Sequence, residues 1–345
     1  MKTERIEIGI LGATGMVGQQ FIALLSNHPW FRVAWLGASE RSAGKKYRDA
    51  CAWRLATPLP DAVADLDVDA ATPGRAPRLV FSGLDSSVAG EIEGTFAQAG
   101  HTIVSNSRNY RMESDVPLLI PEVNGDHLGL LKVQAARGWK GRIVTNPNCS
   151  TVVLSMALAP LRPFSLNKVT ITTLQAISGA GYPGVPSWDI LGNVIPFIDG
   201  EEHKIETETK KILGCIGDRR IDPHPVVISA QTTRVAVQNG HTESISVGFD
   251  HRPSEEDLID AWMSSKPLDG LPSAPAQPIV YLRERNRPQP ALDVDRGRGM
   301  TVTIGRLRPC PILDYKFIAL GHNTIRGAAG VAILNAELMH RDGFL

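Results

Sequence analysis

Residues 7–18 of the 345-residue chain read EIGILGATGMVG, and this stretch decides the fold of the N-terminal part. An apolar run ends at Leu11, and the apolar residues of 16–25 then fall on one face of a helix. Residues 32–37, RVAWLG, have the composition of a second strand. Strand, glycine turn, helix and strand form a βαβ unit, which predicts a parallel sheet.

The same alternation continues along the chain and predicts a doubly wound, Rossmann-type α/β domain. Its further strands are expected at 79–82, 102–105 and 142–145, and its helices at 86–99 and 151–161. Longer strands with period-two alternation follow and predict a second, α+β domain with a mostly antiparallel sheet. They are expected at 168–176, 226–228, 234–238, 242–249 and 301–307. Ser254 should cap a helix, the proline-rich residues 271–290 should form a long loop, and 323–340 should be helical.

The composition is ordinary for a globular enzyme, with 43% hydrophobic residues, 21% charged residues and a formal net charge of +0. This balance favours neither nucleic acid nor an anionic membrane surface as a partner. The four cysteines lie far apart and include no CxxC pair, which argues against a zinc site and a disulfide framework. We therefore expect a cytoplasmic protein without a metal.

The glycine turn predicts a dinucleotide cofactor, because it lies between a strand and a helix within a βαβ unit. Free N–H groups at the start of the helix can bind a pyrophosphate, and a purely structural turn is the alternative. Residues 37–47, GASERSAGKKY, offer donors to a 2′-phosphate and so favour NADP over NAD. Glu40 argues the other way unless it faces solvent, and a solvated loop is the alternative for the basic residues. The expected cofactor contacts are Gly12, Thr14, Gly15, Met16, Val17, Gly18, Ser39, Arg41 and Ser42.

Residues 146–151, NPNCST, follow an expected strand and place Cys149 at a helix N-terminus. There the helix dipole and unpaired N–H groups lower the pKa of a thiol, and the same groups can bind an oxyanion. We therefore expect Cys149 to be a nucleophile, and a small buried apolar side chain is the alternative. The settings of the other three cysteines indicate structural roles.

Residues 234–247, RVAVQNGHTESISV, contain Asn239-Gly240, a strong signal for a two-residue hairpin turn. In such a hairpin Arg234 and His241 would share one face of the sheet, about 13 Å apart at ~3.4 Å per residue. This spacing suits a small substrate, with His241 as acid/base and Arg234 as a carboxylate clamp. A strand-end histidine and a surface arginine are the alternative.

Together these motifs resemble the aspartate-β-semialdehyde dehydrogenase family, most of all its archaeal and fungal branch, over nearly the whole chain. The matching segments include the glycine turn, GASERSAGKKY (37–47), NPNCSTV (146–152), LQAISGAGYPG (174–184), RVAVQNGHTESISV (234–247) and HNTIRGAAG (322–330). The resemblance implies NADPH-dependent reduction of L-aspartyl-4-phosphate to L-aspartate-4-semialdehyde through a cysteine thioester, in lysine, threonine and methionine biosynthesis. It also implies a homodimer or homotetramer that binds a small acyl phosphate or aldehyde and phosphate.

The resemblance further implies roles for individual residues. Cys149 would be the nucleophile, His241 the acid/base, and Gln175 would orient the thioester. Arg234 would bind the substrate α-carboxylate and Glu208 its amino group.

Arg111 and Lys211 would bind the acyl phosphate, with Asn148 nearby; a solvated i,i+3 pair is the alternative for Glu208 and Lys211. The cofactor would also contact Ser178, Gly179 and Asn323. The final helix would return to the first domain. This gives an NADP-binding domain of residues 1–148 plus 322–345, and a catalytic and dimerisation domain of residues 149–321.

Three other functions stay open. An acyl-CoA reductase such as a malonyl-CoA reductase would keep Cys149 and His241, although the presence of both Glu208 and Arg234 favours an amino-acid substrate. N-acetyl-glutamyl-phosphate reductase shares the chemistry, but its motifs fit less well. A non-catalytic NADP-binding regulatory protein would have an unreactive Cys149.

Overall fold

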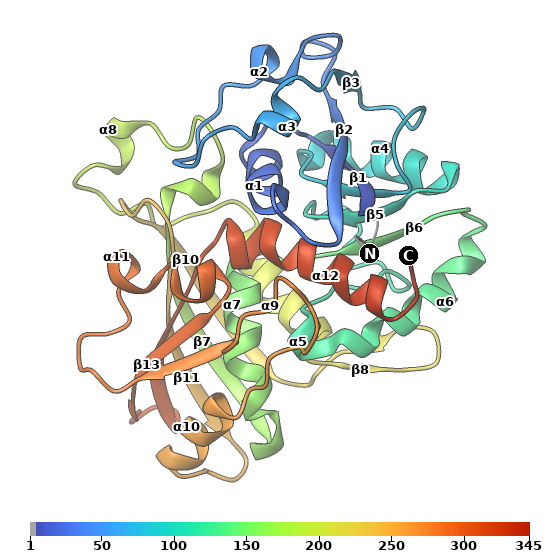
Figure 1. The fold of residues 1–345 in the computed structure, drawn as a ribbon. Coiled ribbons are helices and arrows are strands. Elements are labelled where there is room, and N and C mark those ends of the chain that lie inside the picture. The colour runs from blue at the N-terminus through green and yellow to red at the C-terminus, as the bar shows by residue number, and fades with distance from the viewer. Residues whose placement is uncertain (1–4) are drawn as a thin grey trace.

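The computed structural model describes residues 5–345 and contains two six-stranded sheets (Figure 1). The N-terminal sheet has the order β3-β2-β1-β4-β5-β6, and all neighbouring strands in it are parallel. The order reverses at β1, which is the arrangement of a doubly wound fold. Its strands are β1 (Ile6–Leu11), β2 (Phe31–Ala38), β3 (Val68–Ala70), β4 (Leu79–Ser82), β5 (Thr102–Ser105) and β6 (Arg142–Thr145).

Helices flank this sheet, and α4 shows why its bounds could be predicted. Asp85 accepts a hydrogen bond from the backbone of Ser87 at the start of α4, and Gly100 adopts the left-handed conformation at its end. These are standard start and stop signals for a helix. The helices of this part are α1 (Met16–Leu25), α2 (Tyr47–Ala50), α3 (Asp61–Ala64), α4 (Ser86–Ala99), α5 (Pro121–Asn124) and α6 (Leu130–Gln134).

The second sheet is mixed and has the order β10-β7-β11-β14-β13-β12. Its three central pairings are antiparallel, whereas the pairings at both edges are parallel. The expected mostly antiparallel sheet is therefore confirmed. Its strands are β7 (Leu166–Gln175), β10 (Val227–Arg234), β11 (His241–Phe249), β12 (Ile279–Leu282), β13 (Val302–Pro309) and β14 (Tyr315–Gly321).

The hairpin predicted around Asn239-Gly240 was wrong. β10 ends at Arg234, and β7 lies between β10 and β11, so these two strands are not hydrogen-bonded to each other. His241 pairs with Gly321 of β14 instead. Two further strands of this sheet were missed, since β12 lies within the loop predicted at 271–290 and β14 was not predicted at all.

Two helices, α7 and α12, pack into the hydrophobic cores of the two sheets. α7 is buried on nearly every side against the second sheet, and α12 returns to the core of the first, where Ile333 and Leu338 pack in the same cluster as Ile8. Figure 1 shows α12, in red, between the two sheets. The remaining elements are α7 (Cys149–Leu158), α8 (Ser187–Ile190), α9 (Glu201–Ile212), β8 (Cys215–Ile216), β9 (Ile221–Asp222), α10 (Glu255–Met263), α11 (Pro290–Asp293), a π-helical turn (Ile325–Ala329) and α12 (Gly330–Arg341).

α10 begins as expected, with a capping box between Ser254 and Asp257. None of the helices within residues 5–345 has the length and apolar character that a membrane span requires.

Candidate active site

Cys149 is the first residue of α7, as expected, and Asn148 caps this helix. The side-chain oxygen of Asn148 accepts hydrogen bonds from the backbone N–H groups of Ser150 and Thr151, at 3.0 and 3.2 Å. The cap explains why the helix starts at this residue. The nucleophile predicted from NPNC therefore lies on the rigid junction between β6 and a buried helix.

The tertiary structure brings Cys149 and His241 into contact. Cys149 Sγ lies 3.1 Å from Nε2 of His241, the first residue of β11. The other ring nitrogen, Nδ1, accepts a hydrogen bond from the backbone N–H of Ala176 at 3.1 Å. A thiol beside a buried imidazole is the arrangement that nucleophilic acyl transfer uses.

Burial dominates the electrostatics of this pair. It raises the pKa of the Cys149 thiol to about 12, and Glu201 acts in the same direction, while Arg234 and Arg111 oppose it. The backbone N–H of Ser150 at the helix N-terminus acts to lower the thiol pKa, as expected, but desolvation of a thiolate outweighs it and the net shift is upward. Burial also lowers the pKa of His241 to about 3.

Arg234 reaches the same place from the end of β10, although no hairpin links it to His241. Its Nη1 donates a hydrogen bond to the carbonyl of Ala176 at 2.9 Å. A Cβ on Gly179 would lie 2.8 Å from Arg234 Nη1 and 3.0 Å from His241 Cε1. Gly179 therefore packs directly against both side chains, and a larger residue would displace them.

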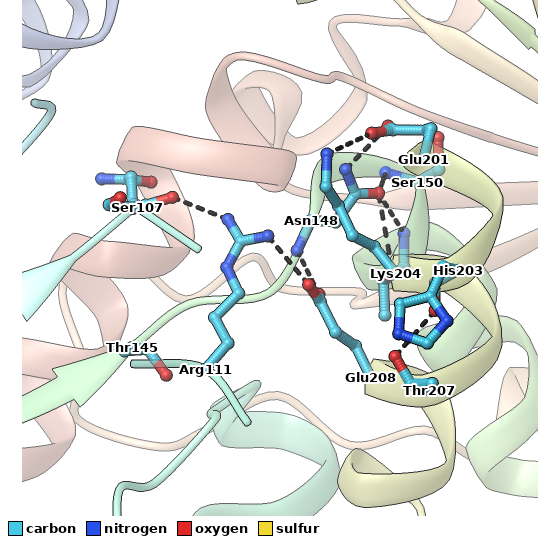
Figure 2. Close-up of polar contacts among 12 residues, drawn as sticks. Ser107, Arg111, Thr145, Asn148, Ser150, Glu201, His203, Lys204, Thr207 and Glu208 are labelled. Carbon is cyan, nitrogen blue, oxygen red and sulfur yellow. Dashed lines mark hydrogen bonds and ion pairs between the residues drawn. The ribbon is translucent and has the colours of Figure 1, made fainter. Parts of the chain in front are cut away.

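Glu201 and Lys204, in the first turn of α9, belong to the site and were not predicted (Figure 2). Glu201 Oε1 accepts hydrogen bonds from Asn148 Nδ2 at 2.7 Å and from Gln175 Nε2 at 3.2 Å. Its Oε2 accepts one from Lys204 Nζ at 3.0 Å. Burial acts to raise the pKa of Glu201, but Lys204, Asn148 and Gln175 outweigh it and the pKa is lowered. Glu201 is thus a buried carboxylate held in its ionised form.

Glu208, two turns further along α9, has a different environment (Figure 2). Its Oε1 pairs with Arg111 Nη1 at 3.0 Å, and its Oε2 accepts from the backbone N–H of Asn148 at 2.7 Å. Arg111 also donates to the carbonyl of Asn106 at 2.6 Å. Arg111 Nε is buried without a hydrogen-bond partner within residues 5–345, so this guanidinium keeps a free donor.

Lys211 is enclosed by backbone carbonyls. Its Nζ donates at 2.7, 2.7 and 2.8 Å to the carbonyl oxygens of Arg111, Glu113 and Val116. Burial lowers the pKa of Lys211 to about 8. An ammonium group has three N–H donors, and all three are used here. These contacts indicate that Lys211 holds the loop that carries Arg111, and they leave no donor for the predicted phosphate contact.

The glycine turn has the geometry that a pyrophosphate needs. Gly12 has a φ of 72°, and a Cβ on Gly18 would lie 2.4 Å from the carbonyl oxygen of Gly12, so both positions require glycine. Gly15 is the N-cap of α1 and offers no side chain to its first N–H groups. Thr14 lies in the turn, and Met16 and Val17 open the helix. The first turn of α1 can therefore bind an anion.

A cavity of about 530 Å³ lies beside the ends of β2, β3 and β4. Ser39, Glu40 and Arg41 line one side of it, and apolar residues that include Leu84 line the other. Within the described chain Arg41 has no side-chain hydrogen bond or ion pair, and Glu40 is exposed. Ser42 lies just outside the cavity, with its backbone N–H on the carbonyl of Ser39. An adenosine with a 2′-phosphate fits this chemistry, because the apolar wall can take the base and Arg41 the phosphate.

The C-terminal segment contacts the site at two places. Asn323 donates to Ser178 Oγ at 2.8 Å and accepts from the backbone N–H of Gly240 at 2.9 Å. A Cβ on Gly327, in the π-helical turn, would lie 2.7 Å from the Cβ of Cys149. The turn therefore packs directly on Cys149, and π-helical turns are frequent at functional sites.

Comparisons with known proteins agree with this geometry. Residues 7–131 match the model of the semialdehyde dehydrogenase NAD binding domain, and residues 158–326 match that of the semialdehyde dehydrogenase dimerisation domain. The chain is 50% identical to aspartate-semialdehyde dehydrogenase of Archaeoglobus fulgidus, over 98% of this chain and 99% of that one. It is 46% identical to the Saccharomyces cerevisiae enzyme of the same name, over 96% of each. The crystal structure of Candida albicans aspartate semialdehyde dehydrogenase with NADP superposes with a TM-score of 0.90, at 44% identity, over 99% of this chain and 100% of that chain. The chain belongs to the aspartate-semialdehyde dehydrogenase family, because relatives of this similarity match it over nearly its whole length.

Proposed function

We propose that this protein is an NADP-dependent aspartate-semialdehyde dehydrogenase, which reduces L-aspartyl-4-phosphate to L-aspartate-4-semialdehyde and releases phosphate. The observation that carries the proposal is the 3.1 Å contact between Cys149 Sγ and His241 Nε2 at the start of α7. Arg111, Arg234 and Glu201 lie close enough to influence the thiol. The family resemblance implies a role in the biosynthesis of lysine, threonine and methionine.

The residues of the glycine turn and of the cavity at the end of β2 fit NADP. The Candida relative carries NADP in its crystal structure, and Ser39 and Arg41 offer donors at the end of β2. The glycine turn would hold the pyrophosphate, and Ser178, Gly179 and Asn323 would lie beside the nicotinamide. Bound there, the cofactor supplies a hydride.

The chemistry proceeds through a thioester on Cys149. The thiol of Cys149 gives its proton to His241, the acid/base that the family resemblance implies. The thiolate attacks the acyl carbon, the bond between that carbon and the phosphate oxygen breaks, and phosphate leaves with the electron pair. The backbone N–H of Cys149 would stabilise the oxyanion that forms during the attack, because Asn148 already accepts from the N–H groups of Ser150 and Thr151. The thioester carbon then accepts a hydride, the carbon–sulfur bond breaks, and the aldehyde departs. Two easier steps replace one difficult step.

Substrate recognition follows from the charges around the thiol. Arg234 would bind the α-carboxylate, and Gln175 would orient the acyl group. Glu201 is better placed than Glu208 for the substrate ammonium group, because its charge acts on both Cys149 and His241, whereas Glu208 pairs with Arg111 and the Asn148 backbone.

For the phosphate, the free donor of Arg111 and the ammonium group of Lys204 are the best candidates, with Asn148 nearby. Lys211 is not, because three carbonyls already take its donors. We therefore revise the role predicted for Lys211 from binding phosphate to holding the loop that carries Arg111.

We also propose the division into an NADP-binding domain (1–148 plus 322–345) and a catalytic and dimerisation domain (149–321). The packing of α12 on the first core and the match to a dimerisation-domain model support it. A homodimer or homotetramer in the cytoplasm is the expected assembly and location.

The test is phosphate-dependent reduction of NADP⁺ with L-aspartate-4-semialdehyde. Activity that disappears in Cys149→Ala is expected. Malonyl-CoA with NADPH is assayed in parallel. Turnover of malonyl-CoA alone would overturn the acyl-phosphate assignment while keeping Cys149 as nucleophile.

A further inference from the structure

We propose that Glu208 is a positioning residue, which fixes the guanidinium group of Arg111 relative to the turn that carries Cys149. It acts on the phosphate half of the reaction without touching the substrate. The inference rests on the proposed function in one respect, namely that Arg111 binds phosphate. It replaces the contact with the substrate ammonium group that the family resemblance implied for Glu208.

The first argument is that the carboxylate of Glu208 joins two separate segments of the chain (Figure 2). Its Oε1 pairs with Arg111 Nη1 at 3.0 Å, and its Oε2 accepts from the backbone N–H of Asn148 at 2.7 Å. Asn148 is the residue before Cys149 and the N-cap of α7. The Glu208 side chain is only 2% exposed, so water competes little for these contacts. Hydrogen bonds between arginine and a carboxylate are strong and directional, so this bridge fixes one segment against the other.

The second argument is that the contacts of Arg111 hold its side chain in one orientation. Its second terminal nitrogen, Nη2, donates to the carbonyl of Asn106 at 2.6 Å, while Nη1 pairs with Glu208. Its backbone carbonyl accepts from Lys211 Nζ at 2.7 Å, so α9 anchors the main chain through Lys211 and the side chain through Glu208. A guanidinium group has five N–H donors, and within residues 5–345 the buried Nε has no partner. A donor therefore remains for an anion on a group that is already oriented.

The third argument is the difference between the two glutamates of α9. Glu201 is the carboxylate whose charge acts on both Cys149 and His241. Arg111 also acts on the thiol, so its guanidinium lies near the reacting atoms. The carboxylate of Glu208 pairs with this guanidinium instead. Glu208 is therefore placed to act on the reaction through Arg111.

The bridge matters for the distance between phosphate and the thioester carbon. In the phosphorylating direction an unprotonated oxygen of phosphate attacks the thioester on Cys149, the carbon–sulfur bond breaks, and sulfur keeps the electron pair. The attacking oxygen has to lie about 3–3.5 Å from that carbon. Arg111 holds the phosphate, and Glu208 ties Arg111 to the residue before Cys149, so both reacting groups are fixed to the same turn. Without the bridge the guanidinium can move, and phosphate binds more weakly.

Steady-state kinetics of Glu208→Gln test this role, with L-aspartate-4-semialdehyde, NADP⁺ and phosphate as substrates. Glutamine has the same shape, but its amide nitrogen cannot accept a hydrogen bond, so one of the two contacts is lost. The KM for phosphate should rise about tenfold, which corresponds to about 1.4 kcal/mol of binding, while the KM for the semialdehyde stays unchanged. A raised KM for the semialdehyde with an unchanged KM for phosphate would overturn the proposal, because Glu208 would then bind the substrate ammonium group.

Glu206→Gln is the matched control, because it removes the same charge from α9. The carboxylate of Glu206 accepts from the backbone N–H of Ala230 at 3.0 Å, a contact that an amide oxygen can keep. Both KM values should stay unchanged in this variant. An equal rise of the KM for phosphate in Glu206→Gln and Glu208→Gln would show a general effect of charge and overturn the proposal.

A double-mutant cycle with Arg111→Met shows whether Glu208 acts through Arg111. Adding Glu208→Gln to Arg111→Met should change the KM for phosphate by less than about twofold, the usual uncertainty of such a cycle. A further tenfold rise would overturn the proposal, because the effect would then bypass Arg111. If Arg111→Met does not fold, the comparison of Glu208→Gln with Glu206→Gln decides alone.

Protection of Cys149 from iodoacetamide by inorganic phosphate gives a measurement without the semialdehyde. Mass spectrometry assigns the label to Cys149, with Cys149→Ala as the control for the other cysteines. The phosphate concentration for half-protection should rise about tenfold in Glu208→Gln and stay unchanged in Glu206→Gln. Equal values in the wild type and both variants, or no protection of the wild type, would overturn the proposal. This measurement needs no turnover, so its outcome is separate from whether the enzyme accepts the proposed aldehyde.

Discussion

A buried carboxyl group in the first domain leads to a quantitative prediction. Glu93 of α4 is completely buried, and its Oε1 accepts a hydrogen bond from Ser105 Oγ at 2.7 Å. Its Oε2 has no hydrogen-bond partner within residues 5–345, and the hydroxyl of Ser82 is also unpaired there. Burial raises the pKa of Glu93 from 4.5 to about 7, while Ser82, Ser105 and Arg111 oppose the shift.

The sign of the pH effect follows from this shift. The folded protein binds the Glu93 proton more tightly than the unfolded chain, so stability falls as the pH rises from 4.5 to about 7. At about 1.4 kcal/mol per pKa unit, the cost is about 1 kcal/mol at pH 5 and about 3 kcal/mol at pH 8. Glu93→Gln cannot ionise and can donate to Ser82, so it should recover most of this free energy at pH 8.

The assay is urea unfolding of wild type and Glu93→Gln at pH 5 and pH 8. We expect the variant to gain about 2 kcal/mol more at pH 8 than at pH 5. Glu91→Gln, at an exposed position of the same helix, is the matched control and should show no such difference. Equal effects of Glu93→Gln at the two pH values would refute the reasoning, because the ionisation would then carry no free energy.

Three further predictions concern the site. Lys204→Met should raise the KM for phosphate about tenfold, which corresponds to the loss of about 1.4 kcal/mol of binding, whereas Lys211→Met should lower the melting temperature, because it leaves three buried carbonyls facing an apolar side chain. Steady-state rates measure the first effect and thermal unfolding the second; a raised KM in Lys211→Met and a lowered melting temperature in Lys204→Met would restore the original assignment of Lys211. Arg41→Ala should raise the KM for NADP about tenfold and leave that for NAD unchanged, since hydrogen bonds to charged groups contribute about 1.5–3 kcal/mol; an equal change for both cofactors would place Arg41 away from the 2′-phosphate. Gly327→Ala should lower kcat about 10²-fold, because its added methyl group would lie 2.7 Å from the Cβ of Cys149; unchanged single-turnover rates would show that the π-helical turn yields without moving the nucleophile.

Much of the fold could be predicted because its signals are local. The spacing of glycines in the first turn, the start and stop residues of α4 and the apolar runs of β4, β5 and β6 each depend on neighbours in the chain. The cysteine could be predicted as a nucleophile for the same reason, since its position at a helix N-terminus depends only on the adjacent strand and turn. β12 was missed because its neighbours include many prolines, and it lies at the edge of the sheet, where proline is tolerated.

The partners of these residues were decided by the tertiary structure. α9 contains two Glu-x-x-Lys pairs seven residues apart, and seven residues are about two helical turns, so both pairs lie on the same face. The sequence alone therefore cannot tell which pair meets the thiol. The structure places Glu201, to which Lys204 is paired, against Asn148 and Gln175, while Glu208 and Lys211 bind the loop around Arg111.

The relation between Arg234 and His241 is the clearest case of a contact that the sequence alone could not predict. Their spacing in sequence suggested a hairpin, but β7, more than fifty residues earlier in the chain, is inserted between their strands. Both side chains still meet at Ala176 and Gly179, which follow β7. Local sequence determined many of the elements and the position of Cys149 at a helix N-terminus, because turns, caps and periodicity depend on adjacent residues. Strand order, burial and the pairing of Cys149 with His241 depend on contacts between distant segments, so only the folded structure decided them.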